Sequence, residues 1–164
     1  MKIGKAKKEQ AKEIVALLKY ICDIHKKGRP DVFISGQPKY DEDDVKRLID
    51  DDNTHIVTAT ENRKVIGYMI AELVDGNKHP HMRSVKTLYI DDICVAPDCA
   101  HKGTGTALFE EAKRIGKDLG CVRIDLNVWA FNESAIKFYE KMGMTVSRMH
   151  MEYELNGIDV GAAV

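Results

Sequence analysis

The chain has 164 residues, which suits one domain over residues 1–164 and is too short for two domains of ordinary size. Its 25 Lys and Arg residues are balanced by 26 Asp and Glu residues, so the chain lacks the basic surplus typical of nucleic-acid-binding proteins, and no nucleic acid is expected as a partner. No apolar run approaches the length of a membrane span, and no apolar stretch follows the basic N-terminus, so we expect a cytoplasmic protein without membrane contact.

The first third of the chain predicts two helices separated by a loop. Residues 2–6 are compatible with a short edge strand. From about Glu9 to Lys26–Lys27 the apolar residues recur at helical spacing, and Gly28 and Pro30 then stop the helix. Residues 28–40 are rich in turn formers and predict a loop, and residues 41–49 predict a short second helix.

The remaining two thirds predict strands that alternate with helices. Residues 55–60 and 64–73 are rich in β-branched residues and predict a β-hairpin. The elements expected after it are a strand over 85–95, a helix between Gly103 and Gly120, a strand over 122–128, a helix over 133–142 and a last strand over 145–155. This order predicts an α/β fold with at least one parallel pair of strands.

The most informative segment is ICVAPDCAHKGTGTAL, residues 93–108, in which a strand leads through a proline turn into two glycines at the start of a helix. Gly103 and Gly105 lack a Cβ, so a phosphate can approach the backbone, where the free N–H groups of the first helical turn favour an anion. Lys102 adds a positive charge. The spacing fits neither the Walker A pattern nor G-x-G-x-x-G, because the third position after Gly105 is Leu108. A phosphate site of another kind and a merely structural pair of glycines both stay open.

This segment resembles the coenzyme A pyrophosphate loop of the GNAT N-acetyltransferases, in which a strand ending in V-x-P is followed by [RQ]-x-x-G-x-[GA] and a helix. The later segment NESAIKFYEKMGM, residues 132–144, resembles the second signature of that family, N-x-x-A-x-x-F-Y-x-x-x-G-[FM]. The two signatures stand in the family's order with a strand between them. One position departs from the pattern, because Ala100 stands where the family has Arg or Gln. Since backbone amides hold most of the pyrophosphate, we expect binding to survive.

The resemblance implies a fold, a cosubstrate and a reaction. The fold is the GNAT-type mixed central β-sheet of about six to seven strands, with about four helices on both faces. The cosubstrate is acetyl-CoA, and its acetyl group passes to the primary amine of a small molecule or protein by direct attack in a ternary complex. The alternative is a non-catalytic acyl-CoA-binding or regulatory domain on the same fold, for which Ala100 is the main support. A homodimer is compatible with the resemblance.

The resemblance also implies where the coenzyme binds. The pantetheine arm would pair with the strand that precedes the loop, as an added β-strand does, and the pyrophosphate would lie on residues 101–106. Asn132 would contact the coenzyme, although capping the helix that follows is an equally natural role for it. The residues expected to bind the coenzyme are Ile93, Cys94, Val95, His101, Lys102, Gly103, Thr104, Gly105, Thr106 and Asn132.

Tyr139 is the candidate general acid. It matches the family position that protonates the departing coenzyme A thiolate, and a phenol remains protonated at neutral pH. The alternative role is an aromatic core residue beside Phe138.

The candidate general base is a carboxylate in LYIDDICV. Asp92 is the first choice, with Ile90 and Cys94 as its companions on one face, and Asp91 is the reserve. Neighbouring residues of a strand point to opposite faces, so only one of the two aspartates should face the cleft unless a bulge intervenes. Either aspartate could instead be a solvated or capped carboxylate. Asn127, where some relatives carry a Glu, cannot act as a base.

No metal is expected. The six histidines include no helical ligand pair, and the four cysteines show neither a CxxC pair nor metal-ligand spacing. The identity of the acceptor amine would be set by the loops 28–40 and 76–83, whose shapes the sequence does not define.

Overall fold

One mixed sheet of five strands organises the part of the chain that the computed structural model describes, which is residues 1–76, 80–81 and 83–155. The strands are β1 (Lys2–Lys5), β2 (Thr54–Glu61), β3 (Lys64–Asp75), β4 (Lys86–Val95) and β5 (Arg123–Leu126). They lie in chain order, with antiparallel pairing from β1 to β4 and parallel pairing between β4 and β5. The expected α/β sheet with a parallel pair is confirmed.

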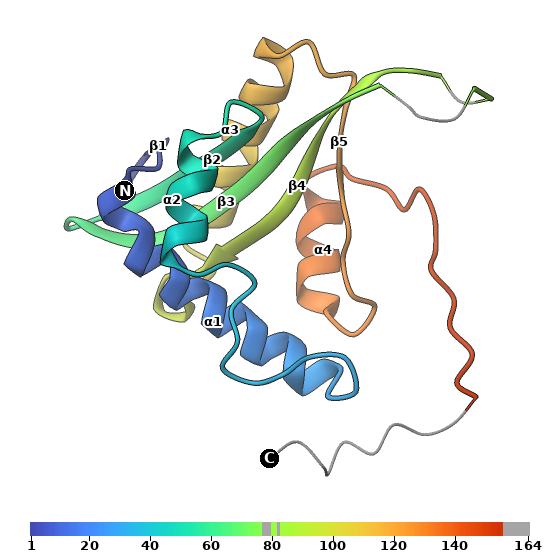
Figure 1. Cartoon of the computed structure of the whole chain (residues 1–164), viewed down its shortest axis with the longest axis horizontal. Helices are drawn as coiled ribbons and strands as arrows, with labels where there is room; N and C mark the ends of the chain where they lie inside the picture. Colours follow the sequence, from blue (N-terminus) through green and yellow to red (C-terminus); the bar gives the residue numbers. More distant parts are fainter. Residues whose placement is uncertain (77–79, 82, 156–164) are drawn as a thin grey trace.

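Helices cover both faces of the sheet (Figure 1). Helices α1 (Ala11–Gly28) and α2 (Glu42–Asp50) lie on one face, and α3 (Thr104–Asp118) and α4 (Glu133–Lys141) belong to the other. Two short 3₁₀ turns, η1 (Lys8–Gln10) and η2 (Pro97–Cys99), precede α1 and follow β4. None of these helices, within the described residues, has the length and apolar character needed to span a bilayer.

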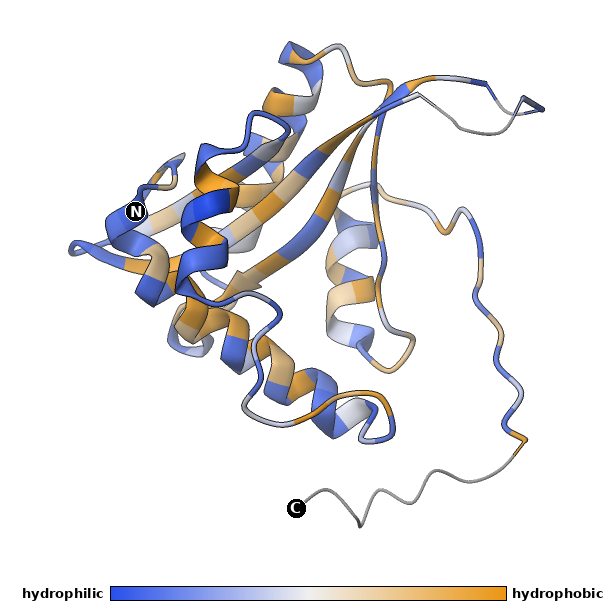
Figure 2. Cartoon of the chain, viewed as in Figure 1, coloured by the Kyte–Doolittle hydropathy of each residue, from blue (hydrophilic) through white to orange (hydrophobic). Residues whose placement is uncertain are grey.

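The alternation of side chains along the central strands produces two hydrophobic cores. Tyr68 and Ile70 of β3 face α1 and α2, whereas their neighbours Met69 and Ala71 face α3, and all four are fully buried. Figure 2 shows the hydrophobic residues in orange along the strands and on the helices beside them. We call these two packings the α1-side core and the α3-side core. The sheet between them is the rigid support of the candidate site.

The last strand, expected over residues 145–155, is wrong. After α4 the chain runs in extended form away from the sheet (Figure 1), and the structure contains no β-strand at these positions. A strand requires backbone hydrogen bonds to a neighbouring strand, and in this chain nothing pairs with the segment among the described residues. Over the residues that the structure describes, the sheet therefore has five strands, fewer than the six to seven that were expected.

Candidate active site

The strands β4 and β5 are paired only along their first halves. Their register runs from Thr87↔Arg123 to Ile90↔Leu126, whereas β4 stays paired with β3 as far as Val95↔Gly67. Figure 1 shows the two strands diverging beside α4. Beyond Ile90, the edge of β4 that faces β5 thus presents backbone N–H and C=O groups without a ladder partner in the described part of the chain. The three residues expected to pair with pantetheine, Ile93, Cys94 and Val95, lie on this edge.

A β-bulge in β4 changes where the two aspartates point. The register between β3 and β4 shifts so that Ile70 lies opposite Asp92 and Ala71 lies opposite Ile90, which leaves Asp91 as the extra residue. Asp92 therefore shares the α1-side face with Ile70, and Asp91 reaches the loop that precedes α2 on that same side. The bulge thus brings together two carboxylates that a regular strand would separate.

The same bulge changes which residues share a face of the sheet with Asp92. Cys94 lies on the α1-side face with Asp92, but Ile90 packs into the α3-side core. The expectation of Ile90 as a companion is wrong, because the extra residue inverts the alternation between positions 90 and 92.

The carboxylate of the half-buried Asp92 is held in place by the buried Tyr68. The Tyr68 hydroxyl donates a hydrogen bond of 3.0 Å to Asp92 Oδ1, and Tyr68 itself is 0% exposed. Burial raises the pKa of Asp92 to about 6, and the hydrogen bond from Tyr68 and the charge of Lys39 offset part of that effect. A carboxylate with a pKa near 6 can both take up and release a proton close to neutral pH.

Asp91 binds an ammonium and a phenol from the loop before α2. Lys39 Nζ forms an ion pair with Asp91 Oδ1, and the Tyr40 hydroxyl donates a hydrogen bond of 2.9 Å to Asp91 Oδ2. Only 10% of the Asp91 side chain is exposed. Burial, followed by the hydrogen bond to Asp91, raises the pKa of Tyr40. Sequence reasoning missed Tyr68, Lys39 and Tyr40; of these, only Tyr68 carried a signal, as a lone phenol in the otherwise apolar strand segment VIGYMIA that requires a hydrogen-bond partner.

Tyr139 reaches the same region from α4. Its ring packs against the α3-side core, with the Phe138 ring 5.3 Å away between centroids. Burial raises the pKa of the Tyr139 hydroxyl, and the nearby Asp92 and Cys94 raise it further. The hydroxyl is therefore protonated at neutral pH and lies within electrostatic reach of the base candidate.

The glycine loop has the features of an anion site. Gly103 is the N-cap of α3, with a φ of 83°, and a Cβ built there would meet no atom within 4 Å. The first turn of α3 carries no acidic residue, and no side chain caps its free N–H groups. His101 and Lys102 are exposed beside it.

The residues that follow Gly103 in the loop have less open space around them or contribute mainly their backbone. Thr104 is 2% exposed, so only its backbone can face a ligand. A Cβ on Gly105 would lie 3.4 Å from the Phe138 ring, which is an ordinary van der Waals contact, so Gly105 lies under α4 and not in open space. Thr106 is exposed one turn further along. The loop can thus offer a ligand backbone N–H groups and open space at Gly103, but few side chains.

Asn132 and Asn127 both have structural partners. Asn132 is the N-cap of α4, and its Oδ1 accepts hydrogen bonds from the Ala135 N–H at 3.2 Å and the Ser134 hydroxyl at 3.0 Å. The Asn127 side-chain amide donates to the Tyr89 hydroxyl at 3.0 Å. The capping role of Asn132 is therefore present, and its amide nitrogen is left for other contacts.

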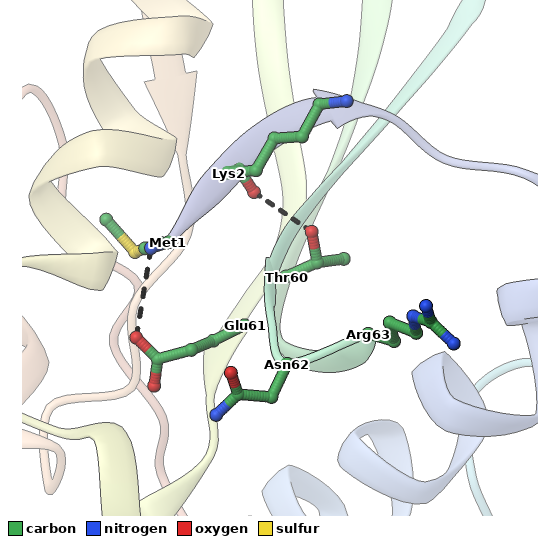
Figure 3. A pocket seen from close by; sticks show the side chains of 6 residues that line it. All are labelled: Met1, Lys2, Thr60, Glu61, Asn62 and Arg63. Carbon is green, nitrogen blue, oxygen red and sulfur yellow. Dashed lines mark hydrogen bonds and ion pairs between the residues drawn. The ribbon is translucent and has the colours of Figure 1, made fainter.

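A hollow elsewhere on the surface contains none of the predicted site residues. It has a volume of about 590 Å³ and lies at the turn between β2 and β3, where the N-terminal amino group pairs with Glu61 at 3.8 Å (Figure 3). It is lined by Met1, Lys2, Thr60, Glu61, Asn62 and Arg63. The converging carboxylates and phenols instead place the candidate site at the opening between β4 and β5. Within residues 1–76, 80–81 and 83–155, no three His, Cys, Asp or Glu side chains are grouped to hold a metal ion.

Comparison with known proteins gives both a family and a fold. The family model described as "Acetyltransferase (GNAT) family" matches residues 18–144. The solved structure of a tetramutant of the BH1408 protein from Bacillus halodurans is 29% identical, covers 94% of this chain and 100% of that one, and has a TM-score of 0.89.

Two more distant structures share the fold. A transcriptional regulator from Bacillus halodurans C-125 is 17% identical, covers 94% of this chain and 99% of its own, and has a TM-score of 0.74. The aminoglycoside N-acetyltransferase AAC(6')-Iy in complex with CoA is 15% identical, covers 95% and 100%, and has a TM-score of 0.70. At these identities the likeness concerns the fold alone.

Proposed function

Because this chain belongs to the GNAT acetyltransferase family, we propose that it transfers the acetyl group of acetyl-CoA to a primary amine of a small molecule or protein. The observation that carries this proposal is the convergence of Asp92, with its pKa of about 6, and the protonated phenol of Tyr139 at the opening between β4 and β5. A proton acceptor and a proton donor are the two groups that amine acetylation requires.

The donor would bind along the unpaired edge of β4. Pantetheine amides can pair with Ile93 to Val95 as an added strand would, and the pyrophosphate can then reach the free N–H groups at Gly103. The amide of Asn132 would add a further contact. The open space over Gly103 supports this placement, since a phosphate needs close access to the backbone.

The acceptor would approach from the side of Asp91. Lys39 already holds an ammonium against this carboxylate, close enough to Asp92 to lower its pKa. The corner is therefore built to stabilise a cation, which supports an amine as the acceptor. An incoming ammonium would take the place of Lys39, and its charge would be balanced by Asp91 before the reaction.

The transfer would proceed in one ternary complex. The ammonium loses one proton to Asp92, and the neutral nitrogen then attacks the thioester carbonyl and forms an N–C bond. The C–S bond breaks as Tyr139 gives its proton to the departing thiolate, and the second proton of the nitrogen passes to Tyr139 as the amide forms. An acyl-enzyme on Cys94 is disfavoured, because burial raises the pKa of that thiol to about 12 and the side chain is only 5% exposed.

A second candidate function is a non-catalytic acyl-CoA-binding or regulatory domain. The specific observation in its favour is Ala100, which removes the side chain that the family pattern uses at the loop. A screen of acetyl-CoA turnover over polyamines, aminoglycosides, amino acids and peptide amines, read as free thiol release, separates the two functions. Coenzyme binding with no turnover on any acceptor would favour the regulatory domain.

Coenzyme A should raise the melting temperature of the protein. At a concentration of about 100 times Kd, a ligand that binds only the folded state adds about 2.7 kcal/mol to the free energy of unfolding. For a chain of this length that corresponds to a shift of about 5 °C or more, measured by differential scanning fluorimetry. ATP and NAD are the matched controls. A shift with either of them and none with coenzyme A would contradict the proposed donor.

Replacing Gly103 with asparagine should weaken coenzyme A binding by about tenfold, because its side chain would occupy the space that the pyrophosphate needs while asparagine tolerates the left-handed backbone. Isothermal titration calorimetry measures the change. Gly120→Asn is the matched control, since Gly120 closes the same helix with a φ of 72° and equally open surroundings. Equal affinities of the two variants would show that Gly103 serves the turn alone.

A further inference from the structure

Lys39 docks on a carboxylate that differs from those paired with the other lysines. Its Nζ forms an ion pair with Asp91, whose side chain is only 10% exposed. In the other lysine ion pairs of the described residues, the carboxylate is at least 53% exposed. Exposed pairs of that kind contribute little to stability. The Lys39 ammonium is instead held at a largely buried carboxylate, in the residue next to the candidate base Asp92.

The loop before α2 is anchored by contacts that do not involve the Lys39 side chain. The Tyr40 hydroxyl donates to the second oxygen of Asp91 at 2.9 Å. Asp41 is the N-cap of α2, and its carboxylate accepts from the Asp44 N–H at 2.8 Å. These contacts fix the backbone directly after Lys39. Since 48% of the Lys39 side chain is exposed, it can leave Asp91 without releasing the loop.

Lys39 also lies near the groups that would perform the transfer. Burial raises the pKa of Asp92, and the positive charge of Lys39 offsets part of that rise. Beyond the effect of burial, the charge of Asp92 raises the pKa of Tyr139. Asp92 is therefore within electrostatic reach of both Lys39 and Tyr139.

The residue type at position 39 suits an acceptor as well as a counter-ion. A lysine ammonium sits on a flexible four-carbon stem, and after losing one proton it is a nucleophilic primary amine. An arginine would neutralise Asp91 equally well, but it cannot be deprotonated in a protein. Lys39 thus has the chemistry of the acceptor amine and already occupies the corner where an acceptor would bind.

We propose that Lys39 is a site of self-acetylation, at which the chain transfers the acetyl group of acetyl-CoA to its own side chain when no other amine is present. This inference rests on the proposed function. Lys39 Nζ loses one proton to Asp92 and forms an N–C bond to the thioester carbonyl carbon. The C–S bond breaks as Tyr139 gives its proton to the departing thiolate, and the second proton of the nitrogen passes to Tyr139. Asp92 then releases its proton to water.

The modification would change the corner at Asp91. Acetylation removes the charge of the lysine, so the side chain no longer pairs with the carboxylate. The Tyr40 hydroxyl still donates to one oxygen of Asp91, but the other oxygen loses its cation. A largely buried carboxylate without a counter-ion favours the binding of a new one. The acetylated chain would therefore accept an external ammonium without having to displace Lys39.

The test is the intact mass of the full chain after incubation with acetyl-CoA and no added amine. The wild type should carry one acetyl group, which peptide mapping should place on Lys39, and Lys39→Arg should carry none. Asp92→Asn should gain the group about a hundredfold more slowly. Lys46→Arg is the matched control, because Lys46 lies on the neighbouring α2 and pairs with the exposed Asp43. It should be acetylated at the wild-type rate.

A second measurement needs no acetyl-CoA. In Lys39→Gln the charge that lowers the pKa of Asp92 is absent, so that pKa should rise above about 6. Carboxyl ¹³C NMR of the chain labelled at aspartate reads this value, with the Asp92 resonance identified by its loss in Asp92→Asn. Lys46→Gln should leave the value unchanged. An identical pKa in wild type and Lys39→Gln would overturn the placement of Lys39 beside the base.

The outcomes separate this inference from the function on which it rests. A chain that acetylates an added amine but leaves Lys39 unmodified would overturn self-acetylation and leave the proposed function intact. A chain that binds coenzyme A but acetylates neither would overturn both. The rate should also be independent of protein concentration, because each chain modifies itself. A rate constant that rises in proportion to protein concentration would mean transfer between copies and would contradict the proposal.

Discussion

Asp92→Asn should lower kcat by about a hundredfold to ten-thousandfold, the range expected when a positioned general base is removed. Asparagine keeps the shape of the side chain and can still accept the hydrogen bond from Tyr68, so the geometry of the opening is preserved. Only the ability to take the ammonium proton is lost. Stopped-flow single-turnover measurements with bound acetyl-CoA isolate this step from product release.

The activity of the wild type should depend on pH through the ionisation of Asp92. The pKa of Asp92 is raised to about 6, and the base must be ionised to act, so kcat/KM of the wild type should fall as pH drops through about 6. Asp92→Asn should lack this acidic limb. An unchanged limb in the variant would assign it to another group and contradict the role of Asp92.

Asp92→Asn should stabilise the fold above about pH 6 even though it lowers activity. A carboxyl whose pKa is higher in the folded than in the unfolded state contributes stability below its unfolded pKa, and that contribution is lost as pH rises through the folded pKa of about 6. Asparagine has no such loss. Asp92→Asn should therefore melt above the wild type at about pH 8 and close to it at about pH 4, the behaviour of a site that sacrifices stability for function.

Asp91→Asn is the matched variant for this experiment. It removes a carboxylate from the adjacent position, but one that binds the ammonium of Lys39 and the phenol of Tyr40. We expect it to raise KM for the acceptor more than it lowers kcat. If Asp91→Asn instead abolished the chemical step while Asp92→Asn retained it, the two roles would have to be exchanged.

Tyr139→Phe should lower the rate of the chemical step by about a hundredfold or more while leaving coenzyme affinity nearly unchanged. The phenylalanine ring keeps the packing against Phe138 and the α3-side core, so the melting temperature should hold. The loss arises because the developing thiolate no longer receives a hydrogen bond from a phenol that is protonated at neutral pH.

Tyr20→Phe is the control for Tyr139→Phe. Tyr20 lies on α1 and packs against the α1-side core, so removal of its hydroxyl should not alter turnover. Single-turnover rates of the two variants, compared with their melting temperatures, separate a catalytic hydroxyl from a packing ring. A wild-type rate in Tyr139→Phe would mean that the thiolate leaves unaided or with a proton from water.

Local chemistry made much of the fold predictable. The helical spacing of apolar residues after Glu9, stopped by Gly28, gave α1 to within a few residues, because a buried stripe must recur with the period of the helix. The strands β2 to β4 were predictable from their runs of β-branched residues. The start of α3 was predictable from Gly103, which in the structure has the positive φ that favours glycine. The two signatures that resemble the GNAT pattern are likewise contiguous stretches of sequence, and the family match extends over both.

Other features depended on residues far apart in the chain, and only the tertiary structure decided them. Tyr68 reaches Asp92 because the β3–β4 register sets them on one face, and the pKa of that carboxylate depends on burial that no single segment contains. The bulge at Asp91 places Ile90 in the α3-side core, not on the α1-side face beside Asp92. Residues 145–155 show the same limit. Their alternating pattern is typical of a strand, but a strand forms only where a partner edge is present, and local sequence does not supply one.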